Sequence, residues 1–143
     1  MKVEIQTGCD DTSVVIRCPQ TSPEIEAMAA KLRGDARLQG TREGVTHLIA
    51  PADVLYFESV DKRTFIYTAD AVYETPLRLY EIEDRITGAD FFRSSKAQIV
   101  NIAKITALVP DFGGRLVAYL PNDERLIISR HYAKQLKERL NTK

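Results

Sequence analysis

The sequence predicts a mainly β protein of the α+β class, built from small sheets and short helices. Three observations predict this fold class. From about residue 45 the chain consists of many short runs rich in Val, Ile, Tyr and Phe, separated by turn residues. Helical signals are short and lie near the start, the middle and the end of the chain. No internal repeat or long linker interrupts the 143 residues, so we expect one domain with a small addition.

Residues 1–40 are expected to form an extension of two strands and a helix. Residues 1–7 alternate loosely between apolar and polar side chains, and residues 13–18 are rich in β-branched ones. A capping hydroxyl, a proline and an acid in residues 21–24 are typical of a helix start. The apolar face of this helix could pack on its own subunit or on a partner. That face comprises Ile25, Met28, Ala29 and Leu32, and Gly34 is expected to end the helix.

Residues 41–143 are expected to form the main domain. Polar or glycine-containing turns separate its apolar runs, as in a sheet made of hairpins. Two stretches instead have apolar residues at helical spacing and predict short helices, the first ending near Gly88. The predicted strands are 45–50, 54–60, 64–68, 72–75, 97–105 extended by 106–109, 116–120 and 125–129, and the predicted helices are 77–86 and 132–140.

The charge of the chain is unevenly distributed although its net value is zero. Residues 1–88 hold 10 Lys and Arg against 15 Asp and Glu, a balance of −5, and residues 89–143 hold 10 against 5, a balance of +5. This separation suggests that the C-terminal part faces a polyanion. An isoelectric point near 6.7 argues against nonspecific coating of nucleic acid, so binding should be local and selective.

The sequence also indicates where the protein is located and which sites it lacks. No run approaches the roughly 20 apolar residues of a membrane span, and no signal peptide is evident, so a cytoplasmic protein without membrane insertion is expected. Cys9, Cys18, His47 and His131 lack zinc-like spacing, and no cofactor is expected. The cysteines could pair between N-terminal strands, but a cytosolic chain favours two reduced thiols.

An enzyme is not expected. Ser129 and His131 would share one face of a strand, and Asp111 and Asp123 precede them, but no third group is specified. The sequence also lacks a nucleophile elbow, a P-loop and an HExxH motif.

We expect the stretch from residue 91 to residue 105 to organise the domain. Phe91 and Phe92 are candidate core anchors, and a mostly apolar run from Ala97 to Ile105 follows. Between them lies a basic, hydroxyl-rich segment, residues 93–96, where small donors and long cations could meet phosphates or base edges. A solvated loop without a ligand is the alternative interpretation of a segment this short.

Three sequence blocks carry a resemblance to a known family. In order, they are Asp-Val-Leu-Tyr-Phe-Glu-Ser at 53–59, Phe-Phe-Arg-Ser-Ser-Lys-Ala-Gln-Ile-Val-Asn at 91–101 and Ile-Ser-Arg-His-Tyr at 128–132. The chain resembles the LytTR DNA-binding domain of bacterial transcription regulators over about residues 45–140. It looks like a short, stand-alone member of that family, whose N-terminal extension could serve homodimerisation.

The resemblance implies an elongated arrangement of small, mostly antiparallel sheets that contacts double-stranded DNA through loops entering successive major grooves. Mapped onto this chain, the contacting loops are the bend at 61–64, the segment 93–96 and the junction 130–131. This chain departs from some members because Asp61, whose charge repels phosphate, precedes Lys62. The implied DNA-contacting residues are Lys62, Arg63, Thr64, Arg93, Ser95, Lys96, Arg130 and His131.

The expected function is therefore sequence-specific DNA binding in transcription regulation. The alternative is a protein–protein interaction module that binds no nucleic acid and uses the N-terminal helix face. Because the acidic first half has no evident ligand pocket, a regulatory partner protein is also considered. The interpretation requires Lys62, Lys96 and Arg130, which are distant in sequence, to gather on one edge of the fold.

Overall fold

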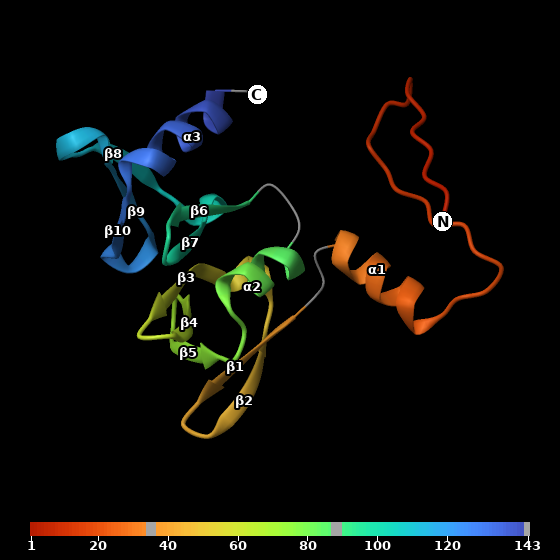
Figure 1. Ribbon diagram of the computed structural model, residues 1–143, viewed down its shortest axis with the longest axis horizontal. Helices are drawn as coiled ribbons and strands as arrows, with labels where there is room; N and C mark the ends of the chain where they lie inside the picture. The colour runs from red at the N-terminus through yellow and green to blue at the C-terminus, as the bar shows by residue number, and fades with distance from the viewer. Residues whose placement is uncertain (34–36, 87–89, 142–143) are drawn as a thin grey trace.

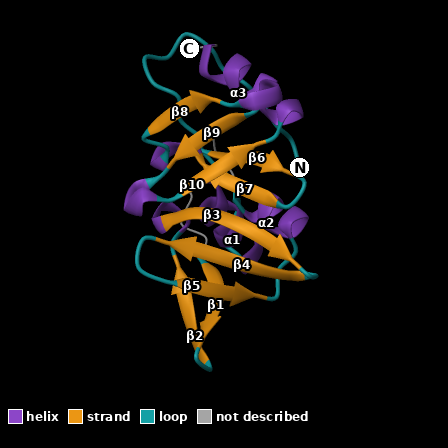
Figure 2. Cartoon of the chain, turned by 90° about the vertical axis from the view of Figure 1, so that its left-hand side faces the viewer, coloured by secondary structure: helices purple, strands orange, loops and turns teal. Residues whose placement is uncertain are grey.

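The computed structural model describes residues 1–33, 37–86 and 90–141. These residues contain a seven-stranded antiparallel sheet in the order β2-β1-β5-β4-β3-β7-β6 and a three-stranded one in the order β10-β9-β8. The strands of both sheets follow one another along the length of the molecule, with β10 beside β6 (Figure 2). The strands are β1 (Leu38–Arg42), β2 (Val45–Ile49), β3 (Val54–Val60), β4 (Arg63–Thr68), β5 (Val72–Thr75), β6 (Phe91–Ser95), β7 (Gln98–Asn101), β8 (Ala107–Pro110), β9 (Leu116–Tyr119) and β10 (Arg125–Ile128).

The described residues also form three α-helices: α1 (Pro23–Arg33), α2 (Leu79–Arg85) and α3 (Arg130–Asn141) (Figure 1). Helix α2 covers one face of the large sheet, and its Ile82 packs in a cluster with Phe57 and Ile99. On the opposite face Tyr56 and other residues of the large sheet pack with the small sheet and α3. The central strands are therefore buried on both faces, which fixes their register. The predicted fold class, mostly antiparallel sheets with short helices, is confirmed.

Strand β1 was not predicted, because Leu38 is the only large apolar residue in its five positions. Leu38 is fully buried, and β1 pairs with both β2 and β5. Gly40 lets β1 approach its neighbours closely, since a Cβ at this position would lie 2.7 Å from Tyr73 Cβ. The expected boundary between residues 40 and 41 therefore falls inside a strand of the large sheet.

The prediction of two strands in the N-terminal extension is wrong, because residues 1–22 contain no strand. Val3 and Ile5 are 77% and 89% exposed, so their alternation does not correspond to a buried face. An isolated two-stranded hairpin is at best marginally stable in water. The helix of the extension is confirmed: it begins at Pro23, and Ser22 Oγ accepts a hydrogen bond from the Ile25 backbone N–H at 3.2 Å.

Two other elements differ from their predicted bounds. The single strand expected from residue 97 to 109 is interrupted after Asn101 by a short 3-10 helix, Ile102–Lys104. The buried Asn101 side chain accepts from Ala103 N at 3.0 Å and donates to Val54 O at 2.9 Å, which turns the chain there. Helix α3 begins at Arg130, two residues before the expected start. The helix ends expected at Gly34 and near Gly88 lie outside the described residues.

Candidate nucleic-acid interface

Backbone hydrogen bonds place the three predicted segments in one row. Ser59 N, close to the β3–β4 turn, donates to Ala97 O in the β6–β7 turn at 2.8 Å. Ser129 N, just before α3, donates to Ser94 O of β6 at 3.1 Å. The turn at 61–62, the turn at 96–97 and the start of α3 thus follow one another along the same end of β3, β7 and β6. We call this row, residues 61–63, 93–97 and 129–131, the basic edge.

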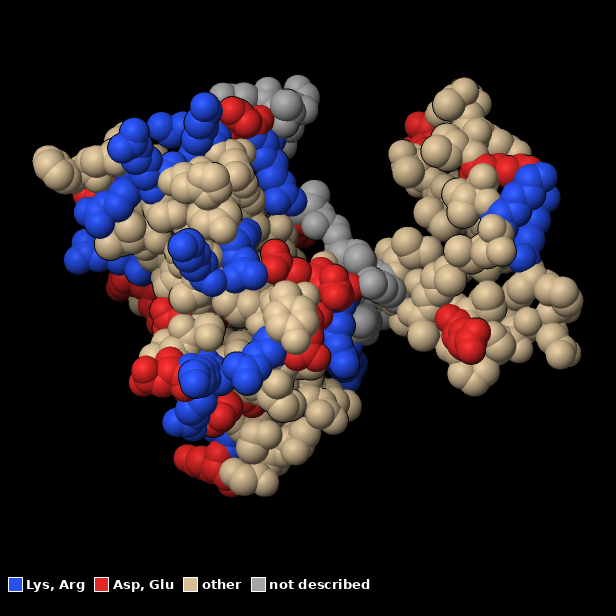
Figure 3. Space-filling model, viewed as in Figure 1, with Lys and Arg blue, Asp and Glu red and all other residues tan. Residues whose placement is uncertain are grey.

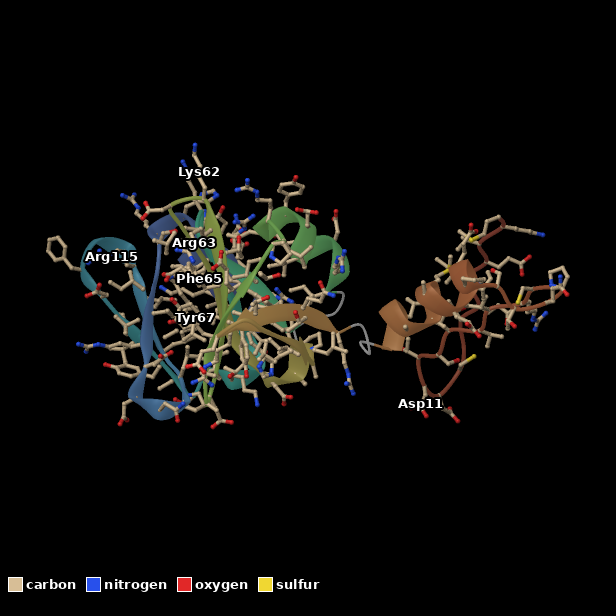
Figure 4. The ribbon with its side chains drawn as sticks, turned by 90° about the horizontal axis from the view of Figure 1, so that it is seen from below. Asp11, Lys62, Arg63, Phe65, Tyr67 and Arg115 are labelled. Atoms are coloured by element: carbon tan, nitrogen blue, oxygen red, sulfur yellow. The ribbon has the colours of Figure 1, made fainter. Side chains whose placement is uncertain are left out.

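Lys62 lies at the tip of the β3–β4 hairpin and is exposed. Asp61 and Lys62 have φ values of 51° and 67°, as in a two-residue type I′ turn. Such left-handed backbone is tolerated by aspartate but is unfavourable for lysine. Arg78 Nη1 donates to Lys62 O at 3.2 Å and braces the turn. Lys62 Nζ projects away from the ribbon into solvent (Figure 4).

Arg63 and Thr64 are less available to a ligand than Lys62 is. The Arg63 guanidinium donates to both carboxylate oxygens of Glu74 and lies 5.3 Å from the ring centroid of Phe65. Its hydrogen bond and its charge hold the pKa of Glu74 below the usual value, so the pair stays ionised at neutral pH. Thr64 is only 3% exposed, because it lies in β4 between Ser59 and Thr75.

The segment 93–96, expected to be a loop, is mostly strand. Arg93, Ser94 and Ser95 belong to β6, and only Lys96 and Ala97 form the turn. The strand was missed because buried Ser94 interrupts the apolar pattern; its Oγ has no hydrogen-bond partner within the described part of the chain.

The polar side chains next to Lys96 are engaged within the fold. Arg93 donates to Lys96 O at 2.8 Å and to Glu83 Oε1 at 2.7 Å. Ser95 Oγ accepts from Ala97 N at 3.2 Å. Lys96 is exposed, and its ammonium has no ion-pair partner among the described residues.

Arg130 and His131 form the first turn of α3 and are both exposed. The helix is held by Ala133 and Leu136, which are buried, and by Tyr132, whose ring meets Phe92 edge-on at 6.4 Å. Core packing therefore orients the start of the helix. His131 Nε2 lies 3.4 Å from Gln135 Nε2.

Two further residues contribute to this region and were not singled out from the sequence. Arg78 supports the Lys62 turn from the residue before α2. Arg115 lies in the β8–β9 loop, and the adjacent Gly114 is so close to Arg130 that a Cβ there would be 3.2 Å from Arg130 Cγ. The sequence signal that could have pointed to Arg115 is the Gly-Gly pair at 113–114, because two glycines mark a tight loop.

Basic side chains gather on one part of the surface. In Figure 3, Lys and Arg concentrate over the part formed by α3 and the small sheet, whereas the part formed by β1–β5 carries both signs. This local concentration agrees with the positive balance of residues 89–143. No group of three metal-ligating side chains occurs in the described residues, where Cys9 and Cys18 are both free. None of the described helices is long and apolar enough to cross a membrane.

Comparison with known proteins finds a family model that matches most of the chain. The family model of the LytTr DNA-binding domain matches residues 44–141. An uncharacterized HTH-type transcriptional regulator of Staphylococcus aureus strain MSSA476 is 35% identical over 99% of both chains. One from strain NCTC 8325 is 28% identical, again over 99% of both chains.

A solved structure has the same fold. The LytTr DNA-binding domain of a putative methyl-accepting/DNA response regulator from Bacillus cereus superposes with a TM-score of 0.71 at 24% identity. It covers 74% of this chain and 97% of its own. In the described part of our chain, strands separate all three α-helices, so a helix-turn-helix is not found there.

Replacing Lys62 by glycine should stabilise the fold, because glycine adopts φ near 67° without steric cost. We expect the free energy of unfolding to rise by up to about 1 kcal/mol in urea titrations, once the entropy cost of glycine is included. Lys96→Gly is the control, since Lys96 lies in a turn without positive φ among its residues. An equal gain in both variants would contradict the assignment of strain to the Lys62 turn.

Proposed function

The chain belongs to the LytTR family of DNA-binding transcriptional regulators, and we propose that it contacts successive major grooves of double-stranded DNA through the basic edge. The family is one of regulators and not of enzymes. The observation that carries the proposal is the alignment of Lys62, Lys96 and Arg130 along the ends of adjoining strands. Such a row suits a duplex, because phosphate contacts fix the register and orientation of a protein on the DNA.

We assign different roles to the exposed residues. Arg130 is suited to bind guanine bidentately in a major groove, with His131 beside it. Lys96 and Lys62 are suited to phosphates, because an ammonium is a flexible point charge. Both turns are short and hydrogen-bonded, so the backbone that carries these two lysines is held in place.

The other expected contact residues have supporting roles in this proposal. Thr64 is buried and Ser95 Oγ is used within its turn, so both shape the edge. Arg63 and Arg93 are ion-paired with Glu74 and Glu83 and must leave these carboxylates before they can bind phosphate. Bending of the duplex towards the edge would bring more of these groups into contact.

We further propose that the protein acts as a cytoplasmic homodimer through its N-terminal extension. None of the side chains described in α1 is buried, and Met28 and Leu32 are 36% and 53% exposed. A hollow lined by Val14, Ile16 and Leu32 lies between the coil and the helix. A second copy would cover these apolar groups and place two basic edges about one helical turn apart on the DNA. Direct and inverted repeats both fit, and a regulatory partner protein could compete for the same surface.

The second candidate function is a protein-binding module without nucleic-acid affinity, favoured by the exposed apolar residues of the extension. The dependence of duplex affinity on salt separates the two functions. A DNA regulator should lose affinity with a slope near −0.9 per neutralised phosphate, and a protein-binding module should show almost no slope.

Arg130→Ala should lower affinity for a duplex selected from a random pool by about 1–3 kcal/mol and relax the preference at one base position. Lys96→Ala should weaken all duplexes evenly and reduce the salt slope by about 0.9, because one phosphate contact is lost. Fluorescence anisotropy over a salt series measures both effects. Arg42→Ala, at the end of β1 in the outer part of the large sheet, is the control. Parent-like binding by both edge variants would refute the assignment.

Glu74→Gln should raise duplex affinity and steepen the salt slope by roughly 0.9, because Arg63 is released to a phosphate. Glu4→Gln is a matched control: it removes the same charge from the exposed Lys2–Glu4 pair in the extension. Equal gains from both variants would mean that net charge, and not the freed Arg63, explains the effect.

Leu32→Glu should convert the dimer to a monomer in sedimentation equilibrium, because it puts a charge into the apolar surface of α1. The variant should bind a duplex with two half-sites more weakly but a single half-site normally. Ala27→Glu, an exposed position in the same helix, should remain dimeric. A parent chain that sediments as a monomer, or a dimer that survives Leu32→Glu, would refute pairing through the extension.

A further inference from the structure

The loop between β8 and β9 presents an aromatic side chain to solvent. Phe112 is 86% exposed, although a phenyl ring has no polar atom that would favour water. A single exposed apolar side chain is common on protein surfaces and does not by itself mark an interaction site. The surroundings of Phe112 are therefore decisive.

The loop that carries Phe112 is braced at its base. The backbone N–H of Asp111 donates to Arg115 O at 2.9 Å, and the side chains of the same two residues form an ion pair at 3.0 Å. Arg115 Nε also donates to Phe112 O at 3.2 Å. Gly113 and Gly114 adopt φ values of 74° and 83° that few other residues tolerate. A compact turn thus fixes the backbone from which the exposed ring projects.

The loop lies directly against the basic edge. Gly114 packs on the aliphatic part of Arg130, where a Cβ would approach Cγ to 3.2 Å. Arg115, labelled in Figure 4, lies in the same loop and is partly exposed. Among the described residues, the ion pair of Arg115 is with Asp111. Phe112 therefore lies in a loop that packs on Arg130 and also carries Arg115, so an exposed apolar ring adjoins the basic edge.

We propose that Phe112 is a further DNA-contacting residue: its ring enters the minor groove next to the major groove occupied by Arg130. This inference depends on the proposed function of the basic edge. Going outward from a major groove, a duplex presents a phosphate strand and then a minor groove. Arg115 meets that strand, and the ring packs on the sugars and wedges into a base step. Apolar wedges of this kind partly unstack the step that they enter.

The test uses the full chain and a duplex selected with it from a random pool. The fluorescent base 2-aminopurine is placed in turn at each base step on either side of the selected binding sequence. The parent chain should raise the fluorescence at one flanking step, because unstacking relieves quenching. Phe112→Ser should abolish that signal and lower affinity roughly tenfold, because the buried apolar area is lost. Phe112→Leu, which keeps an apolar wedge, should retain most of both.

Two control variants separate the possible outcomes. Val45→Ala removes exposed apolar surface from β2, at the far edge of the large sheet, and should bind and perturb the duplex as the parent does. If Arg130→Ala weakens binding while Phe112→Ser does not, the wedge is refuted and the proposed function stands. If neither weakens binding, the proposed function fails as well. If Phe112→Ser changes the sedimentation of the protein without changing any 2-aminopurine signal, the ring packs on a second copy and the inference is overturned.

Discussion

The register of β3, β7 and β6, together with the Ser129–Ser94 hydrogen bond, determines where the cations of the basic edge lie. Phe57 pairs with Ile99 on the face under α2, and Tyr56 pairs with Val100 on the opposite face. A slip of one residue would exchange these faces and move one turn away from the other. Because both faces are buried, such a slip would disrupt the packing of two clusters at once. The core therefore fixes the geometry of the surface.

Acidic side chains limit how strongly the basic edge attracts phosphates. Glu74 and Glu83 each hold an arginine of the basic edge, while Lys62, Lys96 and Arg130 have no ion-pair partner in the described part of the chain. This arrangement limits the density of free positive charge, which governs nonspecific attraction to phosphates. It also keeps the two arginines ordered. A protein with zero net charge can in this way combine weak general attraction with a locally cationic row.

Sequence patterns predicted those elements whose signals are local. The β3–β4 hairpin follows from two β-rich runs around a polar turn, and α1 follows from its capping serine. The patterns failed where pairing with another strand decides whether a segment becomes a strand. Residues 1–7 alternate but have no strand to pair with. Strand β1 has mostly polar residues and forms because β2 and β5 flank it. For the site, the family blocks located the three segments, but the burial of Thr64 and the ion pair of Arg93 depend on neighbours distant in sequence.

The two parts of the chain present opposite kinds of surface, and this contrast bears on how the proposed regulator binds. The basic edge carries its charges on short braced turns and a helix held by the core, so DNA binding has to order their side chains but not their backbone. Helix α1 instead exposes apolar side chains that the described fold leaves uncovered. If these groups pair two copies, the second edge binds at a high effective concentration once the first is bound. Covering α1 with another protein would remove that gain without touching the DNA-facing residues, and so would regulate binding at a distance from the site.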